Sequence, residues 1–191
     1  EDADARRQFT DELLEDVRAL PGVTAASMTS QLPFSGNNSS SVIMPEGYEP
    51  TPGESILSPL QTWVGPDYFA AMGIELVVGR YFQESDGPEA TNAIIIDQWL
   101  ADRYWPDGNA IGDRMAWGVV PGADDVSEDD LFTVVGVVET IKHNDLTAPA
   151  EEHVGAYYFT YRQAPRGFMT LVVRTGTEST GLTPALRAAL S

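Results

Sequence analysis

The side chains that could catalyse a reaction are few and widely spaced along the chain. One possible set combines a serine, a histidine and an acidic residue, at Ser39, His143 and Asp145. In a hydrolase, the histidine of such a set takes the proton of the serine hydroxyl and the carboxylate orients the imidazole. No Gly-x-Ser-x-Gly turn surrounds Ser39, so the elbow that often presents a nucleophilic serine is missing. We therefore rank a hydrolase third among the possible functions and predict no catalytic residue.

Two groups of residues could bind a metal ion. The segment from Asp124 to Asp130 carries five carboxylates, but it lacks the central glycine and final glutamate of an EF-hand loop. The two histidines, His143 and His153, are ten positions apart, which is not the spacing of paired ligands on one helix. We expect a solvated acidic loop and histidines at the surface or at helix caps. The sequence predicts no metal and no cofactor.

The composition excludes several classes of partner. The 191 residues include 29 acidic and 11 basic side chains, for a net charge of −18, and Lys142 is the single lysine. Such a chain repels nucleic acid and anionic lipid headgroups, although adaptation to salt explains the acidity equally well. There is no cysteine, no phosphate-binding Gly-x-x-x-x-Gly-Lys loop and no dinucleotide fingerprint. Any ATP must therefore be hydrolysed by another subunit or domain.

The chain has enough apolar residues to form a core but no predicted membrane span. Hydrophobic residues make up 42% of the sequence, and the apolar run at residues 133–138 is short. A membrane-spanning helix needs roughly 20 such residues. No basic and apolar signal peptide precedes the first predicted element. We expect a soluble fragment whose first residue, Glu1, marks where it was excised.

The first third of the chain predicts one helix followed by short strands. The helix carries on one face, at helical spacing, Phe9, Leu13, Val17 and Leu20, and it should end at Pro21-Gly22. A strand is expected over residues 23–30. Residues 31–41 are rich in serine, asparagine and glycine, which predicts turns, and we place a lobe boundary there. From 41 to 64, several prolines restrict any strands to short pieces.

The remaining sequence predicts short helices between longer strands. Pro66 should start a helix that Gly73 ends, and an extended element should follow. A buried strand at 92–97 leads directly into a helix at 98–105. The valine-rich run at 131–141 predicts a long strand that bends or bulges at Gly136. Further elements are a strand at 156–161 with Tyr157, Phe159 and Tyr161 on one face, a strand at 169–175, and a helix at 182–190.

The order of these elements predicts an α+β fold with two lobes. Helices stand next to strands at both ends of the chain, and the middle is mainly β. If both ends pair in one sheet, the middle is an insertion and both termini leave from the same side. We expect a discontinuous βαβ-type lobe from residues 1–35 and 150–191, and an inserted, mainly β lobe with short helices from residues 36–149.

Motif residues occur in three stretches with a specific order and spacing. The first runs from Val64 through Pro66-Asp67-Tyr68-Phe69 to Gly73-Ile74, and continues with Gly79-Arg80-Tyr81-Phe82 and Asp86. The second comprises Ala93 to Asp97, Leu100-Ala101, Arg103-Tyr104-Trp105-Pro106 and Ile111-Gly112. The third comprises Thr133 to Val138, Lys142-His143, Tyr157-Tyr158 and Met169 to Thr175. Together they resemble the MacB-like periplasmic core domain of FtsX-type ABC-transporter permeases.

The sequence departs from that family pattern at three places. Asp97-Gln98 replaces the usual Asn-Glu, Glu139-Thr140 replaces Gly-Asp, and Phe159-Thr160 replaces a proline-containing turn. The resemblance implies no catalytic residue, so we expect the aromatic and glycine motif residues to serve packing and turns. It also implies a strand before the first helix that this sequence lacks. One sheet edge of the chain-end lobe should therefore be unpaired or covered by another chain.

The resemblance implies a periplasmic domain of an inner-membrane permease that transmits ATP-driven motion of the membrane helices to substrate or periplasmic partners. The chain-end, porter-like lobe would be membrane-proximal and the inserted lobe distal. Implied partners are the transmembrane helices of the same permease, a separate ATPase subunit or domain, and a periplasmic protein or second permease copy. The alternative is a passive binding module for a peptide, lipid or lipoprotein. A deep apolar cleft would favour binding, and a filled interface between the lobes would favour mechanical coupling.

Overall fold

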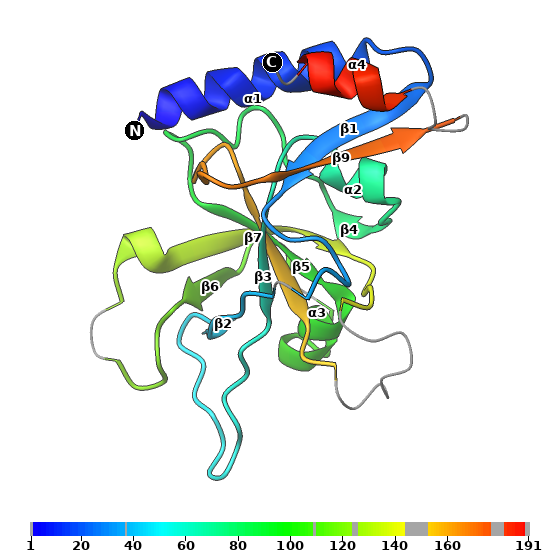
Figure 1. Ribbon diagram of the computed structural model, residues 1–191. Coiled ribbons are helices and arrows are strands. Elements are labelled where there is room, and N and C mark those ends of the chain that lie inside the picture. The colour runs from blue at the N-terminus through cyan, green and yellow to red at the C-terminus, as the bar shows by residue number, and fades with distance from the viewer. Residues whose placement is uncertain are drawn as a thin grey trace.

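The computed structural model describes residues 2–36, 38–108, 110–123, 126–143, 153–176 and 182–189. Figure 1 shows its helices and strands along the chain. The elements are α1 (Ala3–Arg18), β1 (Val23–Thr29), β2 (Ile43–Pro45), β3 (Leu60–Val64), α2 (Tyr68–Met72), β4 (Leu76–Gly79), β5 (Ala93–Asp97), α3 (Gln98–Tyr104), β6 (Arg114–Trp117), the 3-10 turn η1 (Glu128–Asp130), β7 (Leu131–Val138), β8 (Ala156–Thr160), β9 (Thr170–Thr175) and α4 (Leu182–Ala189).

The described strands form one mixed sheet of nine strands. Eight of them follow the order β2-β6-β7-β5-β8-β3-β1-β9, and β4 pairs with β7 beside this path. The pairs β3–β8 and β5–β7 are parallel, and the other pairs are antiparallel. This combination of helices with a mixed sheet confirms the predicted α+β class.

The two ends of the chain come together in the structure. Strand β1 pairs with β9 along its whole length, from Val23 opposite Thr175 to Thr29 opposite Thr170. Helices α1 and α4 lie beside this pair, and both termini are on this side of the molecule (Figure 1). Leu13, Leu14 and Val17 of α1 pack with Ala26 and Met28 of β1, and with residues of β9 and Leu186 of α4. We call α1, β1, β9 and α4 the terminal unit.

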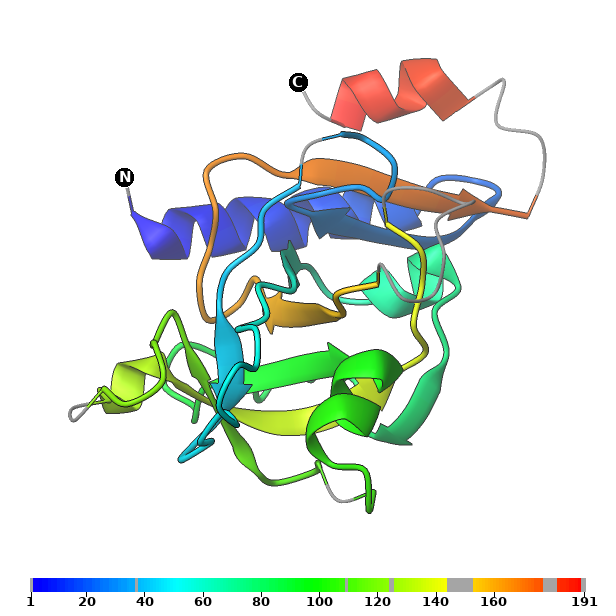
Figure 2. The same ribbon diagram turned by 90° about the horizontal axis from the view of Figure 1, so that it is seen from below.

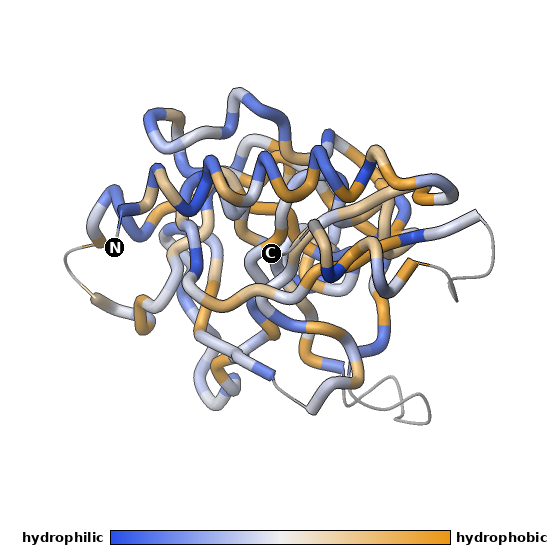
Figure 3. Tube along the Cα trace, turned by 45° about the horizontal axis from the view of Figure 1, so that its top comes forward, coloured by the Kyte–Doolittle hydropathy of each residue, from blue (hydrophilic) through white to orange (hydrophobic). Residues whose placement is uncertain are grey.

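The remaining strands, β2 to β8, are the central strands, and they bury residues on both faces. On one face, Ile94 and Ile96 pack with Leu100 of α3. On the other face, Ile95 packs with Tyr68 and Phe69 of α2. Figure 2 shows α3 and α2 on different sides of these strands, and Figure 3 shows hydrophobic residues concentrated between the elements. The continuous run of isoleucines is therefore explained by burial on both sides of β5.

Four details of the sequence-based prediction are wrong. Phe9 is 56% exposed instead of belonging to the apolar face of α1. Pro66 precedes Asp67, the residue that caps α2, rather than starting the helix. Strand β8 ends at Thr160, so Tyr161 lies beyond it and contacts α1, whereas Tyr157 and Phe159 share one face as predicted. Strand β6 was not predicted, because its four residues are too few for a periodic pattern.

The proposed division into two lobes stays a prediction. The terminal unit contains elements from both chain ends, as that division requires. However, β8 was assigned to the chain-end lobe, and it lies between β5 and β3 among the central strands.

Candidate functional site: the junction of the terminal unit

The terminal unit meets the central strands through β1 and β3. Their pairing is short, with Thr29 opposite Val64. The amide of Gly65 extends the contact by donating to the carbonyl of Met28 at 2.7 Å. A Cβ atom at Gly65 would lie 3.1 Å from the Met28 nitrogen, so the backbones approach closely here. The sheet is therefore continuous across the junction.

Helix α2 fills the junction beneath β1 and β9. The guanidinium of Arg174 on β9 donates to the carbonyl of Ala71 at 3.0 Å. It also occupies the space where a Cβ atom of residue 73 would lie, so a larger residue there would have to displace the guanidinium. Gly73 has a positive φ of 72° and caps α2, which is a second reason for glycine at this position.

Arg18 at the end of α1 makes a second connection to the same region. Its guanidinium lies 2.8 Å from the carboxylate of Asp67 and donates to the carbonyl of Ala26 at 3.0 Å. Asp67 has a left-handed backbone, with φ of 61°, which is unusual for a residue other than glycine. The ion pair is exposed, so we assign it a positioning role more than a large stabilising one.

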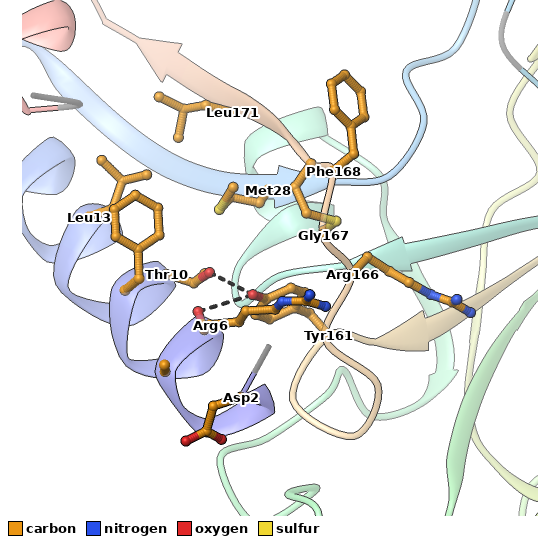
Figure 4. Close-up of a pocket in the computed structure, with 13 residues that line it drawn as sticks. Asp2, Arg6, Thr10, Leu13, Met28, Tyr161, Arg166, Gly167, Phe168 and Leu171 are labelled. Carbon is orange, nitrogen blue, oxygen red and sulfur yellow. Dashed lines mark hydrogen bonds between the residues drawn. The ribbon is translucent and has the colours of Figure 1, made fainter.

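A buried tyrosine fastens the other end of α1. The hydroxyl of Tyr161, just after β8, donates to the carbonyl of Arg6 at 3.0 Å and accepts from the Thr10 hydroxyl at 2.9 Å (Figure 4). The neighbouring Arg162 carbonyl accepts from Arg7 at 3.1 Å. These bonds, together with those of Arg18 and Arg174, hold the terminal unit to the central strands at both ends of α1.

An open groove lies beside this connection, between α1 and the segment that leads into β9. Its volume is about 560 Å³, within the range of about 300 to 1,000 Å³ typical of small-molecule sites. Leu13, Met28 and Leu171 line one part, and the exposed ring of Phe168 stands at the opposite edge (Figure 4). Hydrogen bonds therefore connect the two parts around α2 and Tyr161, while the junction is open at this groove and at a second pocket of about 350 Å³ lined by Arg18, Asp67 and Ala70.

Arg166 points away from the groove toward the central strands (Figure 4). Its guanidinium carbon lies 3.5 Å from the centre of the Trp63 ring, a cation–π contact. Partial burial lowers the pKa of Arg166. The ring of Trp63 in turn packs against Phe159 and Trp117. The segment between β8 and β9 is thus anchored to the aromatic core of the central strands.

The structure does not pair Ser39 with His143, the two members of the proposed Ser-His-Asp set that lie among the described residues. The Ser39 hydroxyl accepts a hydrogen bond from Gln61 at 2.8 Å. His143 is buried, and its Nε2 atom has no hydrogen-bond partner among the described residues. Asp145 lies outside the described residues. Ser39 and His143 share no hydrogen bond in the described part of the chain, so nothing in the geometry activates this serine.

His143 departs from the prediction of surface or capping histidines because it is buried, whereas His153 is only partly buried and contacts the carboxylate that caps α3. His143 is 8% exposed, and His153 contacts the buried carboxylate of Asp97, with 3.1 Å between Nε2 and Oδ2. Burial lowers the pKa of His143; Asp97 opposes this change, and His153 adds to it. Sequence reasoning missed Asp97, although its position between a strand and a helix indicates a capping residue.

The acidic loop is only partly described. Asp124 and Asp125 lie outside the described residues. Glu128 pairs with Arg114 at 2.9 Å, and the amide of Asp129 is capped by the Ser127 hydroxyl. Within the described ranges no group of histidine and acidic residues has the arrangement of a metal site.

The resemblance motif contains one ion pair that the sequence did not reveal. Arg80 donates to both carboxylate oxygens of Asp86, at 2.7 and 2.8 Å, and the amide of Gln83 donates to the same carboxylate. Burial opposes ionisation of Asp86, but these donors outweigh it and lower its pKa. The pair holds the loop after β4 in place.

Comparison with solved structures defines the class of protein to which this fold belongs. The periplasmic region of MacB from Actinobacillus actinomycetemcomitans matches with a TM-score of 0.61 and 15% identity, over 95% of this chain and 72% of that one. The extracellular domain of YknZ, a noncanonic ABC-type transporter from Gram-positive bacteria, matches with a TM-score of 0.56 and 14% identity, over 93% of this chain and 77% of that one. The fold is that of the extracytoplasmic domains of ABC-transporter permeases.

The chain belongs to the MacB-like periplasmic core domain family, whose model matches residues 2–189. Macrolide export ATP-binding/permease proteins MacB from Neisseria gonorrhoeae and Neisseria meningitidis are 30% identical over 76 residues. That match covers 40% of this chain and 10% of each relative, so the chain corresponds to a small part of their length. Among the described helices, none is both long and apolar enough to cross a bilayer.

Proposed function

We propose that this domain transmits ATP-driven movement of permease membrane helices to a substrate or a periplasmic partner, and that it catalyses no reaction itself. The observation that carries the proposal is the set of hydrogen bonds and the ion pair that cross the junction. Tyr161, Arg174 and Arg18 connect the terminal unit to the central strands, so displacement of one part is passed to the other. Packed interiors deform little, which suits a part that transmits force.

The position of the termini supports the same proposal. Both ends of the chain belong to the terminal unit, so membrane helices attached to them would act on that unit. We place this unit on the periplasmic face of the inner membrane and the central strands farther out. A separate ATPase would supply the energy, and a periplasmic protein or second permease copy would contact the outer end. The acidic chain is not expected to bind nucleic acid.

The proposal can be tested in the whole permease with its ATPase, without knowing the substrate. Spin labels at Glu12 on α1 and Glu49 in the loop after β2 report on the two parts; both positions are exposed. Adding ATP with vanadate should move both labels relative to spin-labelled lipid while their mutual distance stays constant. A label at Glu49 that does not move would contradict the proposal.

A variant that weakens the junction provides the second arm of the experiment. Arg174→Ala combined with Arg18→Ala removes the contacts to Ala71 and Asp67, which should broaden the distance between the labels during turnover. The matched control is Arg187→Ala, because Arg187 lies on the exposed surface of α4. If the double variant moves as one body like the control, these contacts do not transmit the movement.

The groove of Figure 4 favours a second candidate, a binding module for the apolar part of a peptide, lipid or lipoprotein. Binding of the fluorescent probe N-phenyl-1-naphthylamine to the whole permease would test it. Phe168→Asp changes a side chain that is 74% exposed, so folding should be preserved. Probe fluorescence that falls in Phe168→Asp would support the binding module, and equal fluorescence would reject it.

A further inference from the structure

The groove between α1 and the segment that leads into β9 changes in chemistry along its length. Leu13, Met28 and Leu171 line one end, and Arg6 and Arg166 lie toward the other (Figure 4). One part of the groove is therefore apolar and the other is cationic. A single elongated molecule can contact both parts at once.

Two exposed phenylalanines enlarge the apolar part. Phe168 is 74% exposed and Phe9 is 56% exposed, and both line the groove. Apolar side chains scattered singly over a surface need no explanation, but those gathered around a hollow indicate a binding site. Covering these rings removes apolar surface from water, which favours an apolar ligand.

The uncharged polar side chains of the groove already have partners within the protein. The Thr10 hydroxyl donates to the Tyr161 hydroxyl, which in turn donates to the Arg6 carbonyl. Thr10 and Tyr161 are also buried, at 2% and 3% exposure. The strong donors for a polar ligand group must therefore come from the arginine side chains.

The two arginines reach the cationic end from different parts of the chain. A guanidinium nitrogen of Arg6 lies 3.7 Å from the place of a Cβ atom at Gly167, the residue next to Arg166. The Arg166 guanidinium stacks on the ring of Trp63. Stacking uses the face of the guanidinium, and within the described ranges no carboxylate pairs with its N–H groups. An anion placed at this end meets two cations.

This end contrasts with the composition of the chain. The sequence has 29 acidic and 11 basic residues, whereas the charged residues that line the groove are Arg6, Arg166 and Asp2. The Asp2 carboxylate accepts from the Asp4 amide at 3.0 Å, so the start of α1 partly offsets its charge. The groove favours an anion, but the acidic surroundings oppose each additional negative charge. A ligand head with one negative charge fits best.

We propose that the groove binds a long-chain carboxylate, with its hydrocarbon chain on the apolar part and its head at Arg6 and Arg166. A guanidinium matches the two oxygens of a carboxylate, which favours this head group. The volume of about 560 Å³ suits one small molecule. A second copy of this acidic chain would be repelled. The inference deepens the second candidate function and rests on the groove being a binding site, not on the transmission of movement.

Two amphiphiles with equal chains and opposite charges test the head group. Dodecanoate and dodecyltrimethylammonium are titrated into the 191-residue chain below the concentrations at which they form micelles. The net charge of −18 attracts the ammonium to the surface as a whole. Tighter binding of dodecanoate, by about tenfold or more in calorimetry, therefore reports the local charge of the groove. Equal or tighter binding of the ammonium overturns the proposal.

The methionines locate the bound molecule. Met28 and Met169 line the groove, whereas Met44 and Met115 are buried in β2 and β6. In an NMR spectrum of methionine methyl groups, dodecanoate should shift the first two signals and leave the other two in place. Saturable binding that leaves Met28 and Met169 unshifted would place the ligand elsewhere and reject the groove.

The length of the hydrocarbon chain tests the apolar part. Each methylene group added between octanoate and dodecanoate should tighten binding by up to about fourfold, because it is removed from water. An affinity that does not rise with chain length would mean that the head alone binds, contrary to the proposal.

Variants test the cationic part. Arg6→Gln and Arg166→Gln should each weaken dodecanoate binding by about tenfold or more, while N-phenyl-1-naphthylamine, which has no carboxylate, binds as before. Arg187→Gln is the matched control, because Arg187 is exposed on α4 and does not line the groove. If Arg166→Gln does not fold, Arg6→Gln decides, since the Arg6 carbonyl that Tyr161 contacts stays in place. Unchanged affinity in Arg6→Gln then rejects the assigned head site.

The two probes separate failure of this inference from failure of the second candidate function. If the naphthylamine probe binds but dodecanoate shows no preference over the ammonium, the groove is a binding site and the carboxylate assignment is wrong. If neither dodecanoate nor the naphthylamine probe binds, both the binding module and the carboxylate site are rejected.

Discussion

Two neighbouring aromatic residues show how differently a buried hydroxyl can be used. Tyr161 places its hydroxyl between Thr10 and the Arg6 carbonyl, at 2.9 and 3.0 Å. Tyr158 is equally buried, but its hydroxyl has no hydrogen-bond partner among the described residues. Leaving a hydroxyl buried and unpaired costs free energy, whereas a satisfied hydroxyl stabilises modestly. Removing the hydroxyl oxygen should therefore lower the free energy of unfolding at Tyr161 but leave it unchanged or raise it at Tyr158.

Tyr161→Phe should lower the free energy of unfolding by about 1 to 2 kcal/mol, because the buried Thr10 hydroxyl and the Arg6 carbonyl on α1 lose their hydrogen bonds to it. Urea unfolding followed by circular dichroism measures this change. Tyr158→Phe is the matched control: it removes the same atom without breaking a bond, and should leave stability unchanged or raise it. Equal losses in both variants would contradict the assigned contacts.

At the residue scale, the sequence identified important positions more readily than their roles. Arg80 and Asp86 stood out as parts of one motif, yet their bidentate pairing is visible only in the folded chain. Asp97 and His153 are far apart in sequence, so no local pattern could predict their contact. Their meeting depends on β5 and β8 becoming neighbours, which is a tertiary event.

At the element scale, the sequence predicted what local periodicity and turn chemistry determine. Helix α1 occupies the expected region because its apolar residues repeat at helical spacing and Gly22 follows its end. Phe9 shares that spacing but is exposed, since it borders the open groove instead of the packed face of α1. Strand β6 was missed because pairing with β2 and β7 defines it, not its own pattern.

The local sequence predicts an irregularity in β7 at Gly136, but the need for glycine there comes from a tertiary contact. The predicted irregularity in β7 is present, because Ile94 and Ile95 pair with Val134 and Gly136 across a register shift. A Cβ atom at position 136 would collide with the carbonyl oxygen of Arg80, which follows β4. Glycine thus allows β4 to approach β7, in addition to permitting the bulge.

Gly136→Ala should destabilise the domain by about 1 to 3 kcal/mol, because β4 must shift away from β7 to accommodate the methyl group. Urea unfolding gives the magnitude, and faster exchange of the Arg80 amide would locate the shift, since this amide donates to Val135 at 2.9 Å. Gly87→Ala is the control, because a Cβ there meets only the Glu84 carbonyl oxygen at 3.8 Å. It should change stability by less than about 0.5 kcal/mol.

At the scale of the whole molecule, the sequence predicted the meeting of the chain ends better than the order of the central strands. Helix and strand stand together at both termini, so a shared layer was a natural expectation, and β1 pairs with β9. The parallel pairing of β3 with β8 joins segments separated by about half of the chain, and no turn residue specifies it. Such pairings are decided by how whole elements pack, not by neighbouring residues.

The net charge also acts on the whole molecule. With 29 acidic and 11 basic side chains, most carboxylates cannot have a cation partner. The arginines in the described ion pairs are at least partly exposed to solvent, as in Arg114 with Glu46 and Glu128. Exposed pairs contribute little, whereas repulsion among the excess carboxylates opposes the compact state. Added salt should therefore stabilise the fold, because screening the repulsion has a larger effect on stability than screening the ion pairs.

Raising NaCl from about 0.01 to 0.15 M, which shortens the screening length from about 30 to 8 Å, should increase the urea concentration at the unfolding midpoint at neutral pH. The same experiment near the isoelectric point, about pH 4.2, is the control, because the net charge vanishes there and the salt effect should disappear. A midpoint that falls with salt at neutral pH would mean that ion pairs such as Arg80–Asp86 outweigh repulsion. Salt would then lower the stability of the domain because it screens those pairs. Local ion pairs would have to offset the repulsion among the excess carboxylates.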